Sequence, residues 1–94
     1  RTHVGVHPHT RFHNSAFKHS ISLDQAAHAL RFPLYHGALS GLAIDNKFLI
    51  IGVDESGKLL ELIYLLDKNG DVLVIHAMKC RPIHFQLLPK GNKT

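Results

Sequence analysis

Four basic side chains fall within nine positions near the C-terminal end of the chain: His76, Lys79, Arg81 and His84. An imidazole titrates near neutral pH, so a histidine here can take a proton from a ribose 2′-hydroxyl or give one to a leaving oxygen. Lysine and arginine can stabilise the negative charge that develops on phosphorus in the transition state. The group predicts phosphodiester chemistry that requires no metal ion, and these four residues are the main catalytic candidates.

Glu61 and Tyr64 lie on the strand expected before this group and are added as catalytic candidates. Because they are an odd number of positions apart on a strand, they point to opposite faces, and at most one of them joins the group directly. His76 is expected to share a strand face with Val72 and Val74. The structural alternative is that His76 is simply a hydrogen-bonded residue at a strand end, beside a solvated basic rim.

The first half of the chain has a helical pattern. A helix is predicted over residues 9–19, because an apolar stripe recurs there at helical spacing. The stripe consists of Phe12, Ala16 and His19. Ser22 and Gln25 have the spacing of a capping box, so a second helix is predicted to follow and to end before Pro33.

After Pro33 the pattern becomes extended. Strands are predicted over residues 34–39, 47–53, 58–66 and 71–78, with turns at 54–57 and 67–70 and a short helix opened by Pro82. The predicted fold class is α+β: two N-terminal helices, a three- to four-stranded antiparallel sheet and a short C-terminal helix. We expect one domain over residues 1–94, with a flexible arm at 1–8 and a folded core at 9–89.

The strand predicted over residues 58–66 is apolar on both alternating sets of side chains, so both of its faces need cover. The two predicted N-terminal helices account for one face. Two possibilities remain for what covers the other face. It is buried either by a protein partner or second copy of the chain, or by the C-terminal segment itself.

Composition limits the class of partner and the compartment. The 94 residues carry a formal charge of +4, which favours nucleic acid or an acidic protein, although ordinary solubility also accounts for it. The single cysteine, Cys80, favours a reducing compartment, and we expect a cytoplasmic protein with no membrane segment. The histidines among residues 3–19 match no closed zinc spacing, so neither a metal nor another cofactor is expected.

Several short strings resemble BrnT-like toxins of the RelE/ParE superfamily. Residues 18–22 (KHSIS), before an alanine-rich helix, are similar to the family's H-G-I/V-S signal. The resemblance continues through residues 48–54, 57–62 and 74–78, with Arg81 just after, and it covers roughly residues 12–88.

The resemblance implies a RelE-like fold and the toxin half of a bacterial type II toxin–antitoxin pair. Such toxins are small, metal-independent endoribonucleases that inhibit translation, with RNA (mRNA, including mRNA on the ribosome) and a cognate antitoxin protein as partners. By position, His76, Lys79 and Arg81 match the end of the family's last strand, and Glu61 and Tyr64 match the strand before it. Lys18 and His19 match the helix-end signal, and we assign them to RNA binding.

The sequence departs from the family pattern at two places. Ser20 replaces the usual glycine, so a left-handed conformation there costs roughly 1 kcal/mol. Met78 stands where an arginine is common, which leaves Lys79 and Arg81 as the nearest cations. The alternative function is a non-catalytic relative that docks an antitoxin, or a second copy of itself as a homodimer, through an apolar sheet face.

Overall fold

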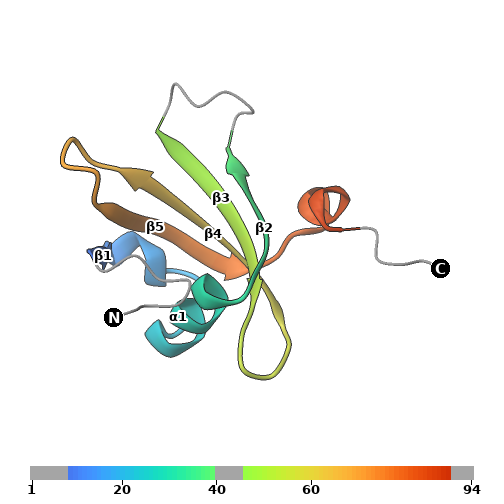
Figure 1. Ribbon diagram of the computed structural model, residues 1–94. Helices are drawn as coiled ribbons and strands as arrows, with labels where there is room; N and C mark the ends of the chain where they lie inside the picture. The colour runs from blue at the N-terminus through green and yellow to red at the C-terminus, as the bar shows by residue number, and fades with distance from the viewer. Residues whose placement is uncertain (1–8, 40–45, 90–94) are drawn as a thin grey trace.

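The computed structural model describes residues 9–39 and 46–89, which form one mixed sheet of five strands with one α-helix against it (Figure 1). The strands lie in the order β1-β5-β4-β3-β2. Their bounds are β1 Thr10–Phe12, β2 Pro33–Ala38, β3 Lys47–Val53, β4 Leu59–Leu66 and β5 Val72–Lys79. The helical segments are α1 Leu23–Arg31 and the 3₁₀ turns η1 Asn14–Phe17 and η3 Pro82–Leu87. The arm expected over residues 1–8 lies outside the described residues.

The predicted fold class, with two N-terminal helices and a three- to four-stranded antiparallel sheet, is wrong. Residues 9–19 form β1 and η1 in place of an α-helix, and β1 pairs parallel with β5, which adds a fifth strand. In this pairing Thr10 lies opposite Val72, and Phe12 lies opposite Val74. The helical spacing of the apolar residues was misleading, because hydrogen bonds to a strand some 60 residues away decide the conformation of this segment.

The other strands lie within one residue of their predicted bounds. Branched residues and turn chemistry explain this agreement. Gly57 and Gly70 take φ values of 86° and 81° in the turns that join β3 to β4 and β4 to β5, a region that glycine enters without a steric penalty. Each turn also has an aspartate, Asp54 or Asp67, whose side chain accepts backbone N–H bonds within the turn.

One face of the sheet is covered by α1 and η1, and it carries the larger core. The predicted capping box is present: the Ser22 hydroxyl accepts from the Gln25 backbone, and the Gln25 side chain accepts from the Ser22 backbone. The helix packs very closely on β3. A Cβ atom at Gly52 would lie 2.1 Å from the Ala29 carbonyl oxygen, so only glycine allows this approach.

The second face has a smaller core, in which Leu49, Ile51 and Cys80 are buried. Leu88, just after η3, packs against this core, and Figure 1 shows η3 beside the sheet on the side away from α1. The C-terminal segment therefore covers part of this face. Further apolar side chains on it remain half-buried: Ile63, Leu65, Leu73 and Met78.

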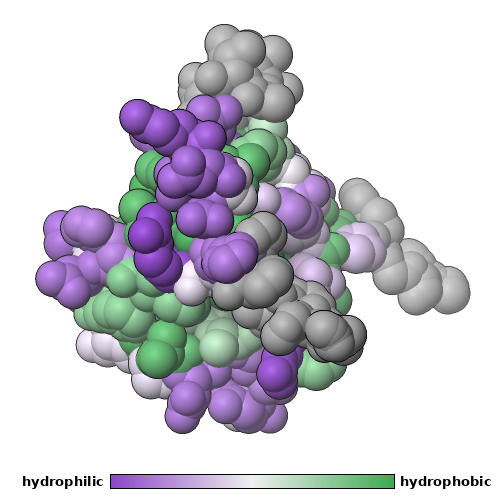
Figure 2. Space-filling model, turned by 60° about the vertical axis from the view of Figure 1, so that its left-hand side comes forward, coloured by the Kyte–Doolittle hydropathy of each residue, from purple (hydrophilic) through white to green (hydrophobic). Residues whose placement is uncertain are grey.

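Hydrophobic residues also reach the molecular surface. Figure 2 shows them gathered below the middle of the face it displays, between hydrophilic residues above and below.

In the part of the chain that the structure describes, no helix is long and apolar enough to cross a membrane.

The backbone of Ser20 is left-handed, with φ 64°, a conformation that glycine adopts at no steric cost. We expect Ser20→Gly to raise the free energy of unfolding by up to about 1 kcal/mol. Urea denaturation of the two proteins measures the difference. Ser22→Gly is the matched control, and it should lower stability instead, because it removes the capping hydroxyl of α1.

Candidate functional site

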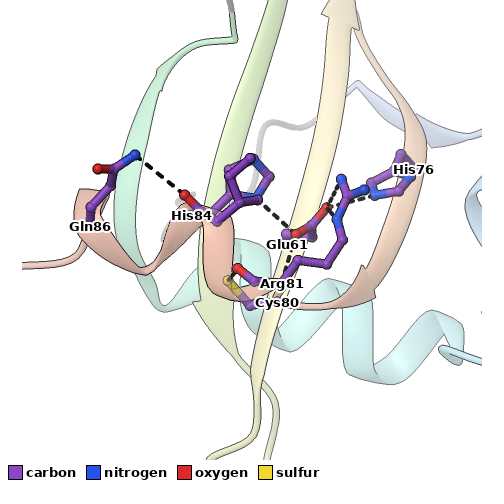
Figure 3. Close-up of polar contacts among 7 residues, drawn as sticks. Glu61, His76, Cys80, Arg81, His84 and Gln86 are labelled. Carbon is purple, nitrogen blue, oxygen red and sulfur yellow. Dashed lines mark hydrogen bonds and ion pairs between the residues drawn. The ribbon is translucent and has the colours of Figure 1, made fainter.

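Glu61 is the centre of a polar cluster on the second sheet face. Its side chain is fully buried, and both carboxylate oxygens accept hydrogen bonds (Figure 3). Oε2 accepts from His76 Nε2 at 3.0 Å and from Arg81 Nε and Nη2 at 3.0 and 2.6 Å. Oε1 accepts from the Arg81 backbone N–H and from His84 Nδ1, each at 2.9 Å. We call Glu61, His76, Arg81 and His84 the Glu61 cluster.

The carboxyl group of Glu61 is ionised at neutral pH. Burial alone would raise its pKa, but the hydrogen bonds from Arg81, His76 and His84 together outweigh burial and lower the pKa to about 2. A carboxylate that is ionised and already accepts five hydrogen bonds is a poor proton acceptor. Its role in the cluster is therefore to hold the three basic residues in place.

The carboxylate fixes the orientation and the tautomer of both imidazoles. A carboxylate only accepts hydrogen bonds, so His76 must carry a proton on Nε2 and His84 must carry one on Nδ1. The other ring nitrogens, His76 Nδ1 and His84 Nε2, make no hydrogen bond within residues 9–39 and 46–89. Two oriented imidazoles with one unused nitrogen each can serve as a proton acceptor and a proton donor.

A β-bulge brings His76 to this face of the sheet. The register shifts between β4 and β5, so that Val74 lies opposite Tyr64 while His76 lies opposite Ile63. The expectation that His76 shares a face with Val74 is therefore wrong, because the extra residue, Ile75, reverses the alternation. The Ser15 hydroxyl in η1 donates to the Ile75 carbonyl at 2.7 Å and holds the bulge.

The Arg81 guanidinium has N–H groups that do not bond to Glu61. Its side chain is 49% exposed, and only Nε and Nη2 bond to Glu61, so the remaining N–H groups make no hydrogen bond within the described residues. The hydrogen bonds to Glu61 raise the pKa of Arg81 further, and the guanidinium stays charged. The backbone N–H bond from Arg81 to Glu61 also fixes the chain just before Pro82 begins η3, which carries His84.

The residues assigned to RNA binding lie next to the cluster. The rings of His19 and His76 meet edge-on, with centroids 5.4 Å apart. Lys18 precedes His19, and its side chain is exposed. The left-handed Ser20 turns the chain directly after them.

Two predicted site residues lie on the other side of the sheet. Lys79 is opposite Leu60, whose side chain belongs to the core under α1, so the register separates Lys79 from the Glu61 cluster. Tyr64 is buried in the same core, and its hydroxyl lies 2.6 Å from His36 Nε2. Burial raises the pKa of Tyr64. Of Glu61 and Tyr64, only Glu61 joins the cluster, as predicted for two residues whose side chains point to opposite faces of the strand.

The central role of Glu61 was not anticipated from the sequence, although a signal was present. Glu61 is the one charged residue in an apolar run from Leu59 to Leu66. A charge in such a strand has to find partners when it is buried, and the strand-end bases were the nearest candidates.

Among the described residues, one group could hold a metal ion. It consists of Glu61, Cys80 and His84, whose ligand atoms lie within 4.8 Å of one another. The thiol of Cys80 is buried, and burial raises its pKa, with the charge of Glu61 adding to the effect.

The lowered pKa of Glu61 predicts a loss of stability in acid. Because the carboxyl is more acidic in the folded chain, its contribution is complete above the unfolded value near 4.5 and is lost as the pH falls towards 2. Asp54, whose pKa is lowered mainly by the Gln25 side chain, acts in the same direction. We expect the free energy of unfolding to fall steadily below about pH 5. Urea denaturation at several pH values measures this fall. The Asp54→Asn variant should still lose the part of the stability that comes from ionised Glu61. A free energy of unfolding that does not change with pH would contradict the lowered pKa of Glu61.

Comparison of the chain with protein-family models, with curated proteins and with solved structures gave no match. The resemblance to BrnT-like toxins stays a prediction from the sequence.

Proposed function

We propose that the chain is a metal-independent endoribonuclease whose active site is the Glu61 cluster, and that it acts as the toxin of a bacterial toxin–antitoxin pair. The observation that carries the nuclease proposal is the convergence of two imidazoles and a guanidinium on one buried carboxylate. The toxin role is supported by the sequence resemblance over residues 12–88.

The proposed reaction is an attack by the ribose 2′-oxygen on the adjacent phosphorus. One imidazole takes the proton of the 2′-hydroxyl while the bond from the 2′-oxygen to phosphorus forms. The bond from phosphorus to the 5′-oxygen breaks, and the other imidazole, protonated at the start, gives its proton to that oxygen. The products are a 2′,3′-cyclic phosphate and a 5′-hydroxyl. His76 and His84 fill these two roles, in either order.

Arg81 stabilises the charge that develops on the phosphoryl oxygens. Its guanidinium is held by Glu61 on one edge, and its unused N–H groups give a charged donor set of fixed orientation. Lys18 and His19, beside His76, are placed to contact the RNA backbone next to the cleaved bond.

A pair of variants tests the site. We expect Arg81→Ala to lower the rate of RNA cleavage about a hundredfold in the presence of EDTA. Lys79→Ala removes a cation two positions away but on the opposite face, and it should stay within about threefold of wild type. The readout is single-turnover cleavage of a labelled RNA, together with growth of cells that express each variant. Intact RNA with wild-type protein, or equal effects of the two variants on growth, would refute the proposal.

A non-catalytic protein-binding role is the alternative, and the half-buried apolar side chains on the second face support it. In that role an antitoxin segment or a second copy would cover Ile63, Leu65 and Leu73. Size-exclusion chromatography with light scattering separates the cases: a tight dimer, or a monomer that aggregates, favours the binding role, and a well-behaved monomer weakens it.

A further inference from the structure

We propose that Glu61, Cys80 and His84 form an inhibitory binding site for a zinc-class divalent cation, one that competes with the Glu61 cluster for two of its members. Binding of the cation stands independently of the nuclease assignment, whereas inhibition of cleavage rests on the proposed function.

Three different donor types meet at one point on the second sheet face. A carboxylate oxygen of Glu61, the Cys80 sulfur and a ring nitrogen of His84 all lie within 4.8 Å of one another. They come from β4, from the residue after β5 and from η3, so the fold, not one local sequence motif, brings them together. Figure 3 shows the Cys80 sulfur below the Glu61 carboxylate and His84 above it, both to its left, with the Arg81 guanidinium and His76 on the right.

This donor set suits zinc better than magnesium or calcium. Zn²⁺ takes thiolate, imidazole and carboxylate ligands in a four-coordinate site, and a water molecule can complete the fourth position here. Hard cations such as Mg²⁺ prefer oxygen donors only and gain little from a sulfur ligand. The site therefore discriminates by ligand type.

Binding of the cation rearranges protons in a defined way. The Cys80 thiol releases its proton to solvent, because a coordinating thiol is deprotonated by the metal. The Nδ1 proton of His84 leaves and Nε2 becomes protonated, so neutral His84 keeps one proton in total. His84 then no longer donates a hydrogen bond to Glu61 Oε1. Its Nε2, now protonated, can no longer accept a proton from the substrate. The bound cation thus removes one proposed proton-transfer group and draws the anchoring carboxylate away from Arg81.

The cation reaches the site by displacement of η3. No residue of this 3₁₀ turn is fully buried; the side chain of His84 is the exception in being mostly buried, and one hydrogen bond holds it to Glu61. Exposed apolar residues on the turn, Ile83 at 68% and Phe85 at 47%, contribute little to the core. A segment with so few buried contacts opens at low cost in free energy.

Cobalt(II) is the probe for binding, because a thiolate ligand gives a sulfur-to-metal charge-transfer band that histidine and carboxylate sites lack. The chain has nine histidines, so metal uptake alone does not identify this site. We expect the band on titration of the full wild-type chain with Co²⁺, and its loss on addition of excess Zn²⁺. Cys80→Ser should not show the band, and Cys80→Ala serves as a second variant in case serine perturbs the fold.

Inhibition is read out in the RNA cleavage assay without EDTA. Cys80 takes no part in the proposed reaction, so Cys80→Ser should cleave at the wild-type rate but need at least tenfold more Zn²⁺ for half-inhibition. A wild-type chain without a charge-transfer band, or equal zinc sensitivity of the two proteins, would overturn the metal site. A band in wild type with no RNA cleavage would support the metal site and refute only the nuclease function.

Discussion

Glu61→Gln is expected to reduce RNA cleavage to background and to lower the free energy of unfolding by about 3 kcal/mol, the cost typical of removing one partner from a buried ion pair. Glutamine keeps the shape of the side chain, but it has only one acceptor oxygen. Its amide N–H₂ would face donors of Arg81 or His84, which then lose their acceptor. Chemical denaturation and single-turnover cleavage measure the two effects.

The chain offers a matched control for this variant. Glu55 is exposed in the turn between β3 and β4, so Glu55→Gln makes the same chemical change away from the cluster. It should shift stability by no more than about 0.5 kcal/mol and leave cleavage unchanged. If Glu61→Gln were as stable and as active as Glu55→Gln, Glu61 would not be the anchor of the site.

His76→Ala and His84→Ala are each expected to slow RNA cleavage by about a hundredfold to ten-thousandfold, the range typical of a lost general acid or base. Both side chains are mostly buried against Glu61, so the variants also need a stability measurement. Because the two imidazoles act in one step, the double variant should lose less than the product of the single losses.

His36→Ala is the control for the histidine variants. His36 is exposed on β2 and bonds to Tyr64 on the opposite face from the cluster, so its removal should leave cleavage within about threefold. A normal rate for either His76→Ala or His84→Ala would exclude that residue from proton transfer, and normal rates for both would refute the proposed mechanism.

The sequence predicted the three long strands well, because their signals are local. Residues 47–53 form β3 with the predicted bounds, since its branched and apolar residues are followed by an aspartate turn that needs no long-range partner. The capping box at Ser22 likewise fixed the start of α1.

Residues 9–19 show why the rest of the fold was not predictable. Phe12 lies at helical spacing from Ala16, yet Thr10 and Phe12 are held by parallel pairing with β5. Because β5 is distant in the sequence, a pattern read over neighbouring residues does not show this pairing. His13 then caps the short turn η1 through its side chain, so the helical segment begins at Asn14 and not at residue 9. Propensity favoured a helix, and tertiary pairing overrode it.

The site was predicted in part, and one inserted residue explains the largest gap. Simple alternation places His76 with Val74, on the face away from Glu61, and the bulge at Ile75 reverses that placement. No residue type near Ile75 marks a bulge. For Lys79 the error is the reverse. It is close to the cluster in sequence and was predicted to belong to it, but the strand register places its side chain on the α1 face.

The most direct test of the central claim uses an RNA that carries a single 2′-deoxy substitution at the bond cleaved by the wild-type protein, in the presence of EDTA. We predict that this bond stays intact, while the unmodified RNA yields a 2′,3′-cyclic phosphate and a 5′-hydroxyl. Cleavage at the deoxy position, or products with a 5′-phosphate, would show that the 2′-oxygen is not the nucleophile and would contradict the role assigned to His76, Arg81 and His84.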